Sequence, residues 1–126
     1  MVTKNKILLA EDDEFLSSLI KNRLVKEGFS VETAKTGDEV LTKVSSFSPD
    51  FLLLDIILPG KLGFDILTEL KAKEETKNLP FIVLSNLGQE SDMKKASDMG
   101  AIAYYVKSKI MIDEIVKKIS EVLKNQ

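Results

Sequence analysis

The sequence contains no cysteine and no histidine among its 126 residues. Without cysteine, the chain can form neither a disulfide framework nor a thiolate metal site. Without histidine, it cannot bind zinc through imidazole, build a catalytic triad on a histidine base or act as a phosphohistidine carrier. These two absences therefore exclude whole classes of metal sites and catalytic centres.

The sequence also lacks an excess of basic residues and any long apolar run. It has 18 Lys and Arg against 20 Asp and Glu, a net charge of −2 and a pI of about 5.3. That balance argues against nucleic acid as a direct partner, because little positive charge is available to neutralise phosphates. No apolar run is long enough for a membrane span, and residues 1–6 lack the apolar core of a signal peptide. We therefore expect a cytoplasmic protein that does not contact a membrane.

The length and the remaining composition are typical of one globular domain, and we expect a single domain over residues 1–126. The sequence is 44% apolar and 30% charged, which is ordinary for a folded protein and excludes long disorder. A chain of this length can bury a normal core.

The most informative stretch runs from Asp50 to Asp55. Residues 51–54 are four consecutive apolar residues, which is typical of a strand buried on both faces of a parallel sheet. The strand must end near Asp55, because Pro59 and Gly60 soon follow and mark a turn. A carboxylate at the end of a buried strand is partly desolvated, which costs free energy unless it is paired or coordinated. A capping role at a turn is the simpler alternative.

Similar patterns divide the rest of the chain into five strands that alternate with five helices. The first helix shows apolar residues at helical spacing, and Gly28 is its expected C-terminal cap. That apolar face is predicted to contain Phe15, Leu16, Leu19, Ile20 and Leu24. The strands are expected at residues 6–10, 29–34, 51–54, 80–84 and 102–106. The first helix is expected to end near residue 26, and the fourth to cover residues 89–99. The second, third and fifth helices are expected to begin at residue 37, at about residue 62 and at about residue 113.

This alternation predicts an α/β fold in which helices cover both faces of a parallel five-stranded sheet. The commonest arrangement for this count is the flavodoxin-like (βα)5 three-layer sandwich with strand order 2-1-3-4-5. The polar second strand fits an edge position. Ligands bind such folds at the carboxyl ends of strands one and three, where Glu11, Asp12 and Asp55 are expected to meet. Ser85 and Lys107 end strands four and five.

Three carboxylates at one edge repel one another, so their convergence predicts a cation site. Oxygen ligands without histidine or cysteine favour Mg²⁺. A carboxylate beside Mg²⁺ can act as a nucleophile toward a phosphoryl group and form an acyl phosphate. Lys107 would supply a second positive charge, and Ser85 a hydroxyl donor. Taken alone, Lys107 would more often be a solvated lysine at a strand end.

Four motifs stand out, at residues 8–13 (Leu-Leu-Ala-Glu-Asp-Asp), 53–60 (Leu-Leu-Asp-Ile-Ile-Leu-Pro-Gly), 83–85 (Val-Leu-Ser) and 104–107 (Tyr-Tyr-Val-Lys). They resemble those of bacterial two-component response-regulator receiver domains of the chemotaxis-regulator type, and the resemblance covers essentially the whole chain. It implies that Asp55 accepts a phosphoryl group from a sensor histidine kinase or a phosphotransfer protein. It also implies that the chain is a signalling switch and not an enzyme. Such a switch catalyses only its own phosphorylation and its own slow dephosphorylation.

The same resemblance assigns roles to individual residues. It implies that Asp12, Asp55 and the backbone carbonyl of Ile57 bind Mg²⁺ directly, with Glu11 acting through water. It implies that Lys107 contacts the phosphoryl group. The output surface would be the face of the fourth helix, fifth strand and fifth helix, which would bind a downstream protein or a second copy of the chain. The remaining implied members of the site are the switch pair, Ser85 and Tyr104.

The sequence departs from the family pattern beside several of these residues. Ser108 replaces the proline that commonly follows the lysine, Asn86 replaces a small residue, and Leu62 replaces an acid before Gly63. Because a cis Lys-Ser bond would cost roughly 2.5–4 kcal/mol, we predict a trans bond, a rerouted loop and a lysine that still reaches Asp55. Two apolar residues expected to flank the phosphoryl group, Ile57 and Leu87, predict slow dephosphorylation.

Other classes fit less well. A flavin-binding protein would need a polar, Gly-rich phosphate loop after the first strand, and a P-loop NTPase would need its Gly-rich Lys-Ser/Thr loop. An aspartate-based phosphatase of the haloacid-dehalogenase type would need an acid at position 57, which is Ile57. The open alternative is a phosphorylation-independent protein-interaction module with the same fold. The kinase, the stimulus and the output partner cannot be read from the sequence.

Overall fold

The computed structural model describes residues 5–86, 90–109 and 111–124. Its centre is a sheet of five strands in the order β2-β1-β3-β6-β7, and every neighbouring pair is parallel. With β6 and β7 as the fourth and fifth of these strands, the predicted order 2-1-3-4-5 is confirmed. The strands, in spatial order, are β2 (Ser30–Ala34), β1 (Lys6–Ala10), β3 (Phe51–Asp55), β6 (Phe81–Ser85) and β7 (Tyr104–Val106).

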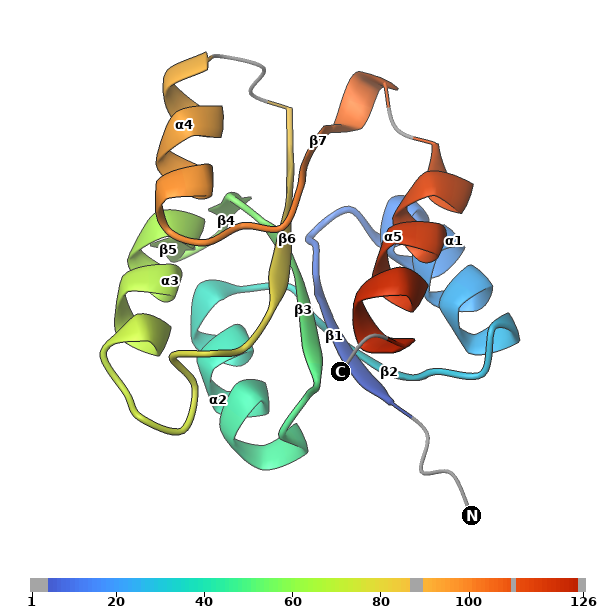
Figure 1. Cartoon of the computed structure of the whole chain (residues 1–126), viewed down its shortest axis with the longest axis horizontal. Coiled ribbons are helices and arrows are strands. Elements are labelled where there is room, and N and C mark those ends of the chain that lie inside the picture. The colour runs from blue at the N-terminus through green and yellow to red at the C-terminus, as the bar shows by residue number, and fades with distance from the viewer. Residues whose placement is uncertain (1–4, 87–89, 110, 125–126) are drawn as a thin grey trace.

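Helices cover both faces of this sheet, which gives the predicted three layers (Figure 1). On one face lie α2 (Gly37–Phe47), α3 (Gly63–Lys71) and α4 (Glu90–Asp98). On the other face lie α1 (Glu14–Lys26) and α5 (Ile112–Lys124). Right-handed crossovers place successive helices in this way, and the carboxyl ends of the parallel strands share one edge of the sheet.

The strands divide the core into two hydrophobic clusters because successive side chains point to opposite faces. In β3, Leu52 and Leu54 pack with α2, α3 and α4, while Phe51 and Leu53 pack with α1 and α5. All four side chains are completely buried. This burial on both faces is why the sequence of β3 reads as a continuous apolar run.

The predicted apolar face of α1 is wrong in part. Ile20 and Leu24 are buried and Leu16 packs against the same cluster, but Phe15 is 70% exposed and Leu19 is 41% exposed. Successive residues of a helix are rotated by about 100°, so the residues that precede Leu16 and Ile20 turn toward solvent. The helix is apolar on more than one side, and only its inner side faces the sheet.

Two short elements were not predicted. A small antiparallel hairpin is formed by β4 (Ile57–Leu58) and β5 (Lys61–Leu62), with Pro59 and Gly60 at its turn. A short 3₁₀ helix, Lys107–Lys109, follows β7. β7 itself is shorter than the predicted strand over 102–106. Residues 102 and 103 nevertheless remain hydrogen-bonded to β6. The Ile102 amide donates to the Phe81 carbonyl (2.9 Å), and the Val83 amide donates to the Ala103 carbonyl (3.0 Å).

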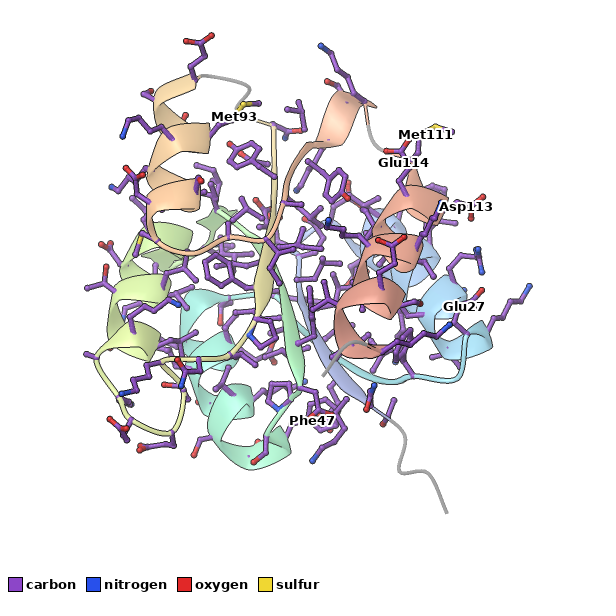
Figure 2. The ribbon with its side chains drawn as sticks, viewed as in Figure 1. Glu27, Phe47, Met93, Met111, Asp113 and Glu114 are labelled. Carbon is purple, nitrogen blue, oxygen red and sulfur yellow. The ribbon has the colours of Figure 1, made fainter. Side chains whose placement is uncertain are left out.

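The two helices on the second face are joined at the surface by an ion cluster. Arg23 of α1 donates hydrogen bonds to Glu27 (3.0 Å) and to Asp113 of α5 (2.7 Å). Both acidic residues are labelled on the same side of the molecule in Figure 2. Because all three side chains are at least partly exposed to solvent, the pairing contributes little free energy.

Candidate functional site

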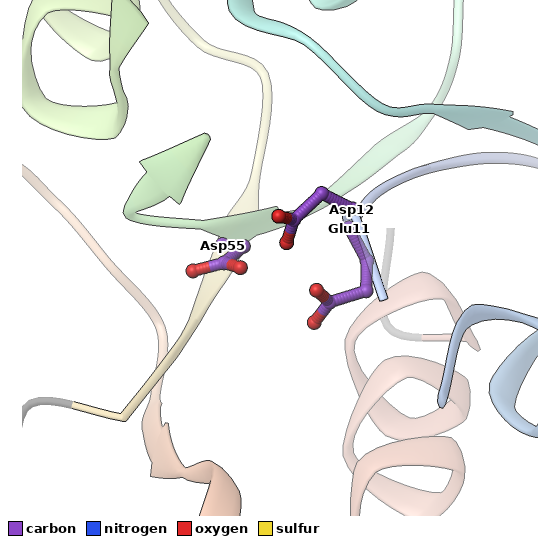
Figure 3. Close-up of side chains that lie close together, drawn as sticks. All are labelled: Glu11, Asp12 and Asp55. Carbon is purple, nitrogen blue, oxygen red and sulfur yellow. The ribbon is translucent and has the colours of Figure 1, made fainter. Parts of the chain in front are cut away.

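Three carboxylates meet at the carboxyl ends of the two central strands. β1 ends at Ala10, directly before Glu11 and Asp12, and β3 ends at Asp55. The strands are parallel neighbours with Ala10 opposite Leu54, so these residues emerge side by side. Each carboxylate offers an oxygen within 4.8 Å of the others. Figure 3 shows the three carboxylates lying close together, as the predicted convergence required.

Two of these acids are buried and share one lysine. Glu11 is 0% exposed and Asp55 is 2% exposed. Lys107 Nζ donates hydrogen bonds to Asp55 Oδ2 (2.6 Å) and to Glu11 Oε2 (2.8 Å). It also lies 2.6 Å from Glu11 Oε1, which accepts no hydrogen bond among the described residues, so that contact is ionic. The lysine therefore neutralises part of a negative charge that burial would otherwise make costly.

Burial and pairing shift the pKa values of this cluster. Burial raises the pKa of Glu11 to about 7, and the nearby Asp55 adds to this shift although the hydrogen bonds from Lys107 and the Asp13 amide oppose it. Burial alone would lower the pKa of Lys107, but its hydrogen bonds to Asp55 and Glu11 outweigh that effect and raise it. Lys107 is therefore a cation at neutral pH, held among acids.

The neighbouring backbone orients the carboxylates. The Asp13 amide donates to Glu11 Oε2 (3.0 Å), and the Ile57 amide donates to Asp55 Oδ1 (3.0 Å). Asp13 itself caps α1 by accepting a hydrogen bond from the Leu16 amide (3.1 Å). Asp12 is exposed, and its carboxylate has no hydrogen-bond or ion-pair partner among the residues that the structure describes. Helix capping thus accounts for the acidic residue at position 13, but not for Glu11 and Asp12.

Ser85 lies on β6, the strand next to β3, and Tyr104 lies on β7, one strand further from Asp55. Ser85 is the last residue of β6 and is completely buried, and the residue before it, Leu84, is opposite Asp55. Tyr104 begins β7 and packs partly buried against the cluster formed with α2, α3 and α4. Tyr105 packs against the opposite cluster. Only the first tyrosine therefore shares a face with α4.

A family model of the response regulator receiver domain matches residues 7–120. The chain belongs to this family of receiver domains. The receiver domain is 40% identical over 102 residues to the phosphate regulon transcriptional regulatory protein PhoB of Rhizobium meliloti. It is 42% identical over 103 residues to the transcriptional regulatory protein CpxR of Escherichia coli. These matches cover 81% and 82% of this chain, but only 45% and 43% of the two relatives.

Solved structures of receiver domains share the fold. The crystal structure of a CheY-like response regulator receiver domain protein from Methanospirillum hungatei superimposes with a TM-score of 0.88 at 26% identity. The alignment covers 98% of this chain and 96% of that one. Among the described residues, no helix has both the length and the apolar character that a membrane span requires.

The geometry agrees with several expectations from the sequence. Lys107 reaches Asp55, and the Lys107–Ser108 peptide bond is trans, both as predicted. The second contact of Lys107, with Glu11, was not predicted, because the direction of a long side chain leaves no pattern in a sequence. Leu87, one of the two expected apolar flanks, lies outside the described residues, and the other flank, Ile57, is 50% exposed.

Proposed function

We propose that this receiver domain accepts a phosphoryl group on Asp55 from a phosphohistidine of a sensor kinase or phosphotransfer protein, and that the modification switches a protein-interaction surface. The proposal rests chiefly on one observation, the buried Asp55 carboxylate, which accepts a hydrogen bond from Lys107 and has an oxygen within 4.8 Å of oxygens of Glu11 and Asp12. Membership of the receiver family supports it, because such domains belong to signalling response regulators. The chain is accordingly proposed to be a switch rather than a classical enzyme.

The donor set fits Mg²⁺. All the candidate side-chain ligands are carboxylates, and Asp12 is both exposed and without a partner among the described residues. Asp12, Asp55 and the backbone carbonyl of Ile57 would hold the ion, with Glu11 contributing through water. When bound, Mg²⁺ would supply positive charge to the phosphoryl oxygens and offset the repulsion among the acids. The remaining chemistry falls to the side chains.

Transfer requires Asp55 to attack phosphorus. A bond forms between a carboxylate oxygen and phosphorus while the phosphorus–nitrogen bond of the donor imidazole breaks and its electron pair stays with the imidazole. Lys107 already lies 2.6 Å from that carboxylate, so its ammonium group is available to the phosphoryl oxygens once they arrive. Positioning and charge account for most of the rate in such transfers.

The output would come from Ser85 and Tyr104. A phosphoryl group brings strong acceptor oxygens, toward which the Ser85 hydroxyl would move. Tyr104 would then turn inward and alter the face made by α4, β7 and α5. We propose that this face binds a downstream protein or a second copy of the chain. The named relatives are transcriptional regulatory proteins, which makes control of transcription by a longer protein one outcome to test.

The decisive experiment is a mass measurement after incubation with Mg²⁺ and acetyl phosphate. The wild-type chain should gain one phosphoryl group, whereas Asp55→Asn should gain none and Asp12→Ala should need more Mg²⁺. Stoichiometric modification of Asp55→Asn would refute the assignment of the acceptor. An unmodified wild-type chain would favour the alternative, an interaction module that works without phosphorylation.

A further inference from the structure

The β4–β5 hairpin follows Asp55 directly and is fixed to the end of β3. The Ile57 amide donates to Asp55 Oδ1 (3.0 Å), and the Gly63 amide donates to the Ile56 carbonyl (2.6 Å). A methyl group on Gly63 would stand 2.6 Å from Ile56 Cα. The base of the hairpin is therefore closely fitted against the residue that follows Asp55.

The other part of the hairpin rests on the first residue of α2, which lies beside β5 (Figure 1). The Gly37 amide donates to the Pro59 carbonyl (3.2 Å). A methyl group on Gly37 would stand 2.3 Å from Lys61 Cβ and 3.2 Å from both the Cα and the carbonyl oxygen of Lys61. No carbon is tolerated at 2.3 Å, so an alanine at position 37 would displace the hairpin or the helix.

Backbone conformation does not explain this glycine. Gly28, Gly60 and Gly100 have positive φ values, but Gly37 does not. At a helical position with an ordinary φ, alanine is the better helix former, because glycine loses more conformational freedom on folding. Gly37 is therefore required by the space that Lys61 occupies and not by the turn that precedes α2.

We infer that Gly37 is a positioning residue for the Mg²⁺ site. This inference rests on the proposed function, in which the Ile57 carbonyl is a ligand. Within the hairpin, Lys61 is opposite Leu58 and Leu62 is opposite Ile57, so a shift of Lys61 is transmitted to the backbone of Ile57. Lys61 Cβ is bonded directly to the backbone and cannot swing aside as the end of a side chain can. The missing side chain of Gly37 thus sets the position of the hairpin beside Asp55.

The test is a rescue experiment with the whole chain. Wild type, Gly37→Ala, Lys61→Gly and the double variant are compared by calorimetric titration with Mg²⁺, well below their melting temperatures. Gly37→Ala should weaken Mg²⁺ binding roughly tenfold or more, as is typical when support behind a metal ligand is lost. Lys61→Gly should bind nearly as the wild type does. The double variant should recover most of the affinity, because the 2.3 Å contact is gone.

Controls separate this role from general packing and from the proposed function. Ser46→Ala, at an exposed position of the same helix, should change neither melting temperature nor affinity. Wild-type affinity in Gly37→Ala overturns the inference, and so does a folded double variant with affinity still lowered roughly tenfold. If Gly37→Ala does not fold, the Mg²⁺ affinity of the folded double variant decides: an affinity near that of the wild type supports the inference, and one still lowered roughly tenfold overturns it. A wild-type chain that binds no Mg²⁺ would instead refute the proposed function itself.

Discussion

Lys107 and Asp55, which are 52 positions apart in the sequence, are joined by a hydrogen bond of 2.6 Å between Nζ and Oδ2. The lysine side chain is only 12% exposed and the carboxylate side chain 3%, so water screens the pair weakly. The same ammonium group lies 2.6 Å from Glu11 Oε1. One cation thus compensates two buried acids.

Replacement of Lys107 by methionine should therefore destabilise the protein. Asp55 and Glu11 would remain buried without their shared donor, and we expect the free energy of unfolding to fall by about 1–3 kcal/mol. Urea denaturation at neutral pH measures this change. Lys109→Met, at an exposed position of the same 3₁₀ helix, should stay within about 0.5 kcal/mol of the wild type. Equal losses in the two variants would contradict the buried role of Lys107.

Replacement of Asp12 should stabilise the protein, in contrast to replacement of Lys107. Asp12 is exposed, and its carboxylate lies within 4.8 Å of oxygens of Glu11 and Asp55 without a compensating partner among the described residues. Asp12→Ala should therefore relieve repulsion and raise the free energy of unfolding by up to about 1 kcal/mol in the absence of Mg²⁺. The same variant should bind Mg²⁺ more weakly, which calorimetric titration measures. A variant that is less stable without Mg²⁺ would show that Asp12 has a structural role instead.

Most of this fold could be predicted because the core strands are buried on both faces. The apolar run of β3 and the position of Asp55 at its end follow from the residues alone, and the parallel order then brings Glu11 and Asp12 to the same edge. The buried side of α1 could not be chosen correctly, because Phe15 and Leu19 are as apolar as the residues that face the sheet.

The β4–β5 hairpin shows a second limit. Its strands have two residues each, which is too short for any periodicity to appear in the sequence. Its position depends on contacts with distant residues, such as the approach of Lys61 to Gly37. The hydrogen bonds of Lys107 are limited in the same way, since they depend on the path of the chain after β7.

The proposed switch predicts a chemical-shift pattern that extends beyond the acidic site. After phosphorylation with acetyl phosphate and Mg²⁺, amide signals should move around Asp55 and also around Tyr104 and α4, because the proposed function couples these regions through Ser85. Comparison of ¹⁵N spectra of the two forms measures this. Ser85→Ala should still accept the phosphoryl group but lose most of the changes near Tyr104. Changes confined to the surroundings of Asp55 in the wild type would refute the switch.

The lifetime of the phosphorylated form should depend on Ile57. Hydrolysis of an acyl phosphate needs a water molecule aligned with phosphorus, and an apolar side chain cannot orient one. Ile57 follows Asp55 by two residues, its amide donates a hydrogen bond to the Asp55 carboxylate, and the residue is 50% exposed. We therefore expect slow spontaneous dephosphorylation, and a several-fold faster decay in Ile57→Asn, whose amide can hold a water molecule.

The decay is followed by mass spectrometry after the phosphodonor is removed. Val25→Asn is the matched control, since Val25 is also 50% exposed but lies at the far end of α1 from the acidic site. The control should decay at the wild-type rate. If Ile57→Asn and the wild type lose the phosphoryl group at the same rate, the side chain at position 57 does not control the attack of water. The rate must then be set by another residue.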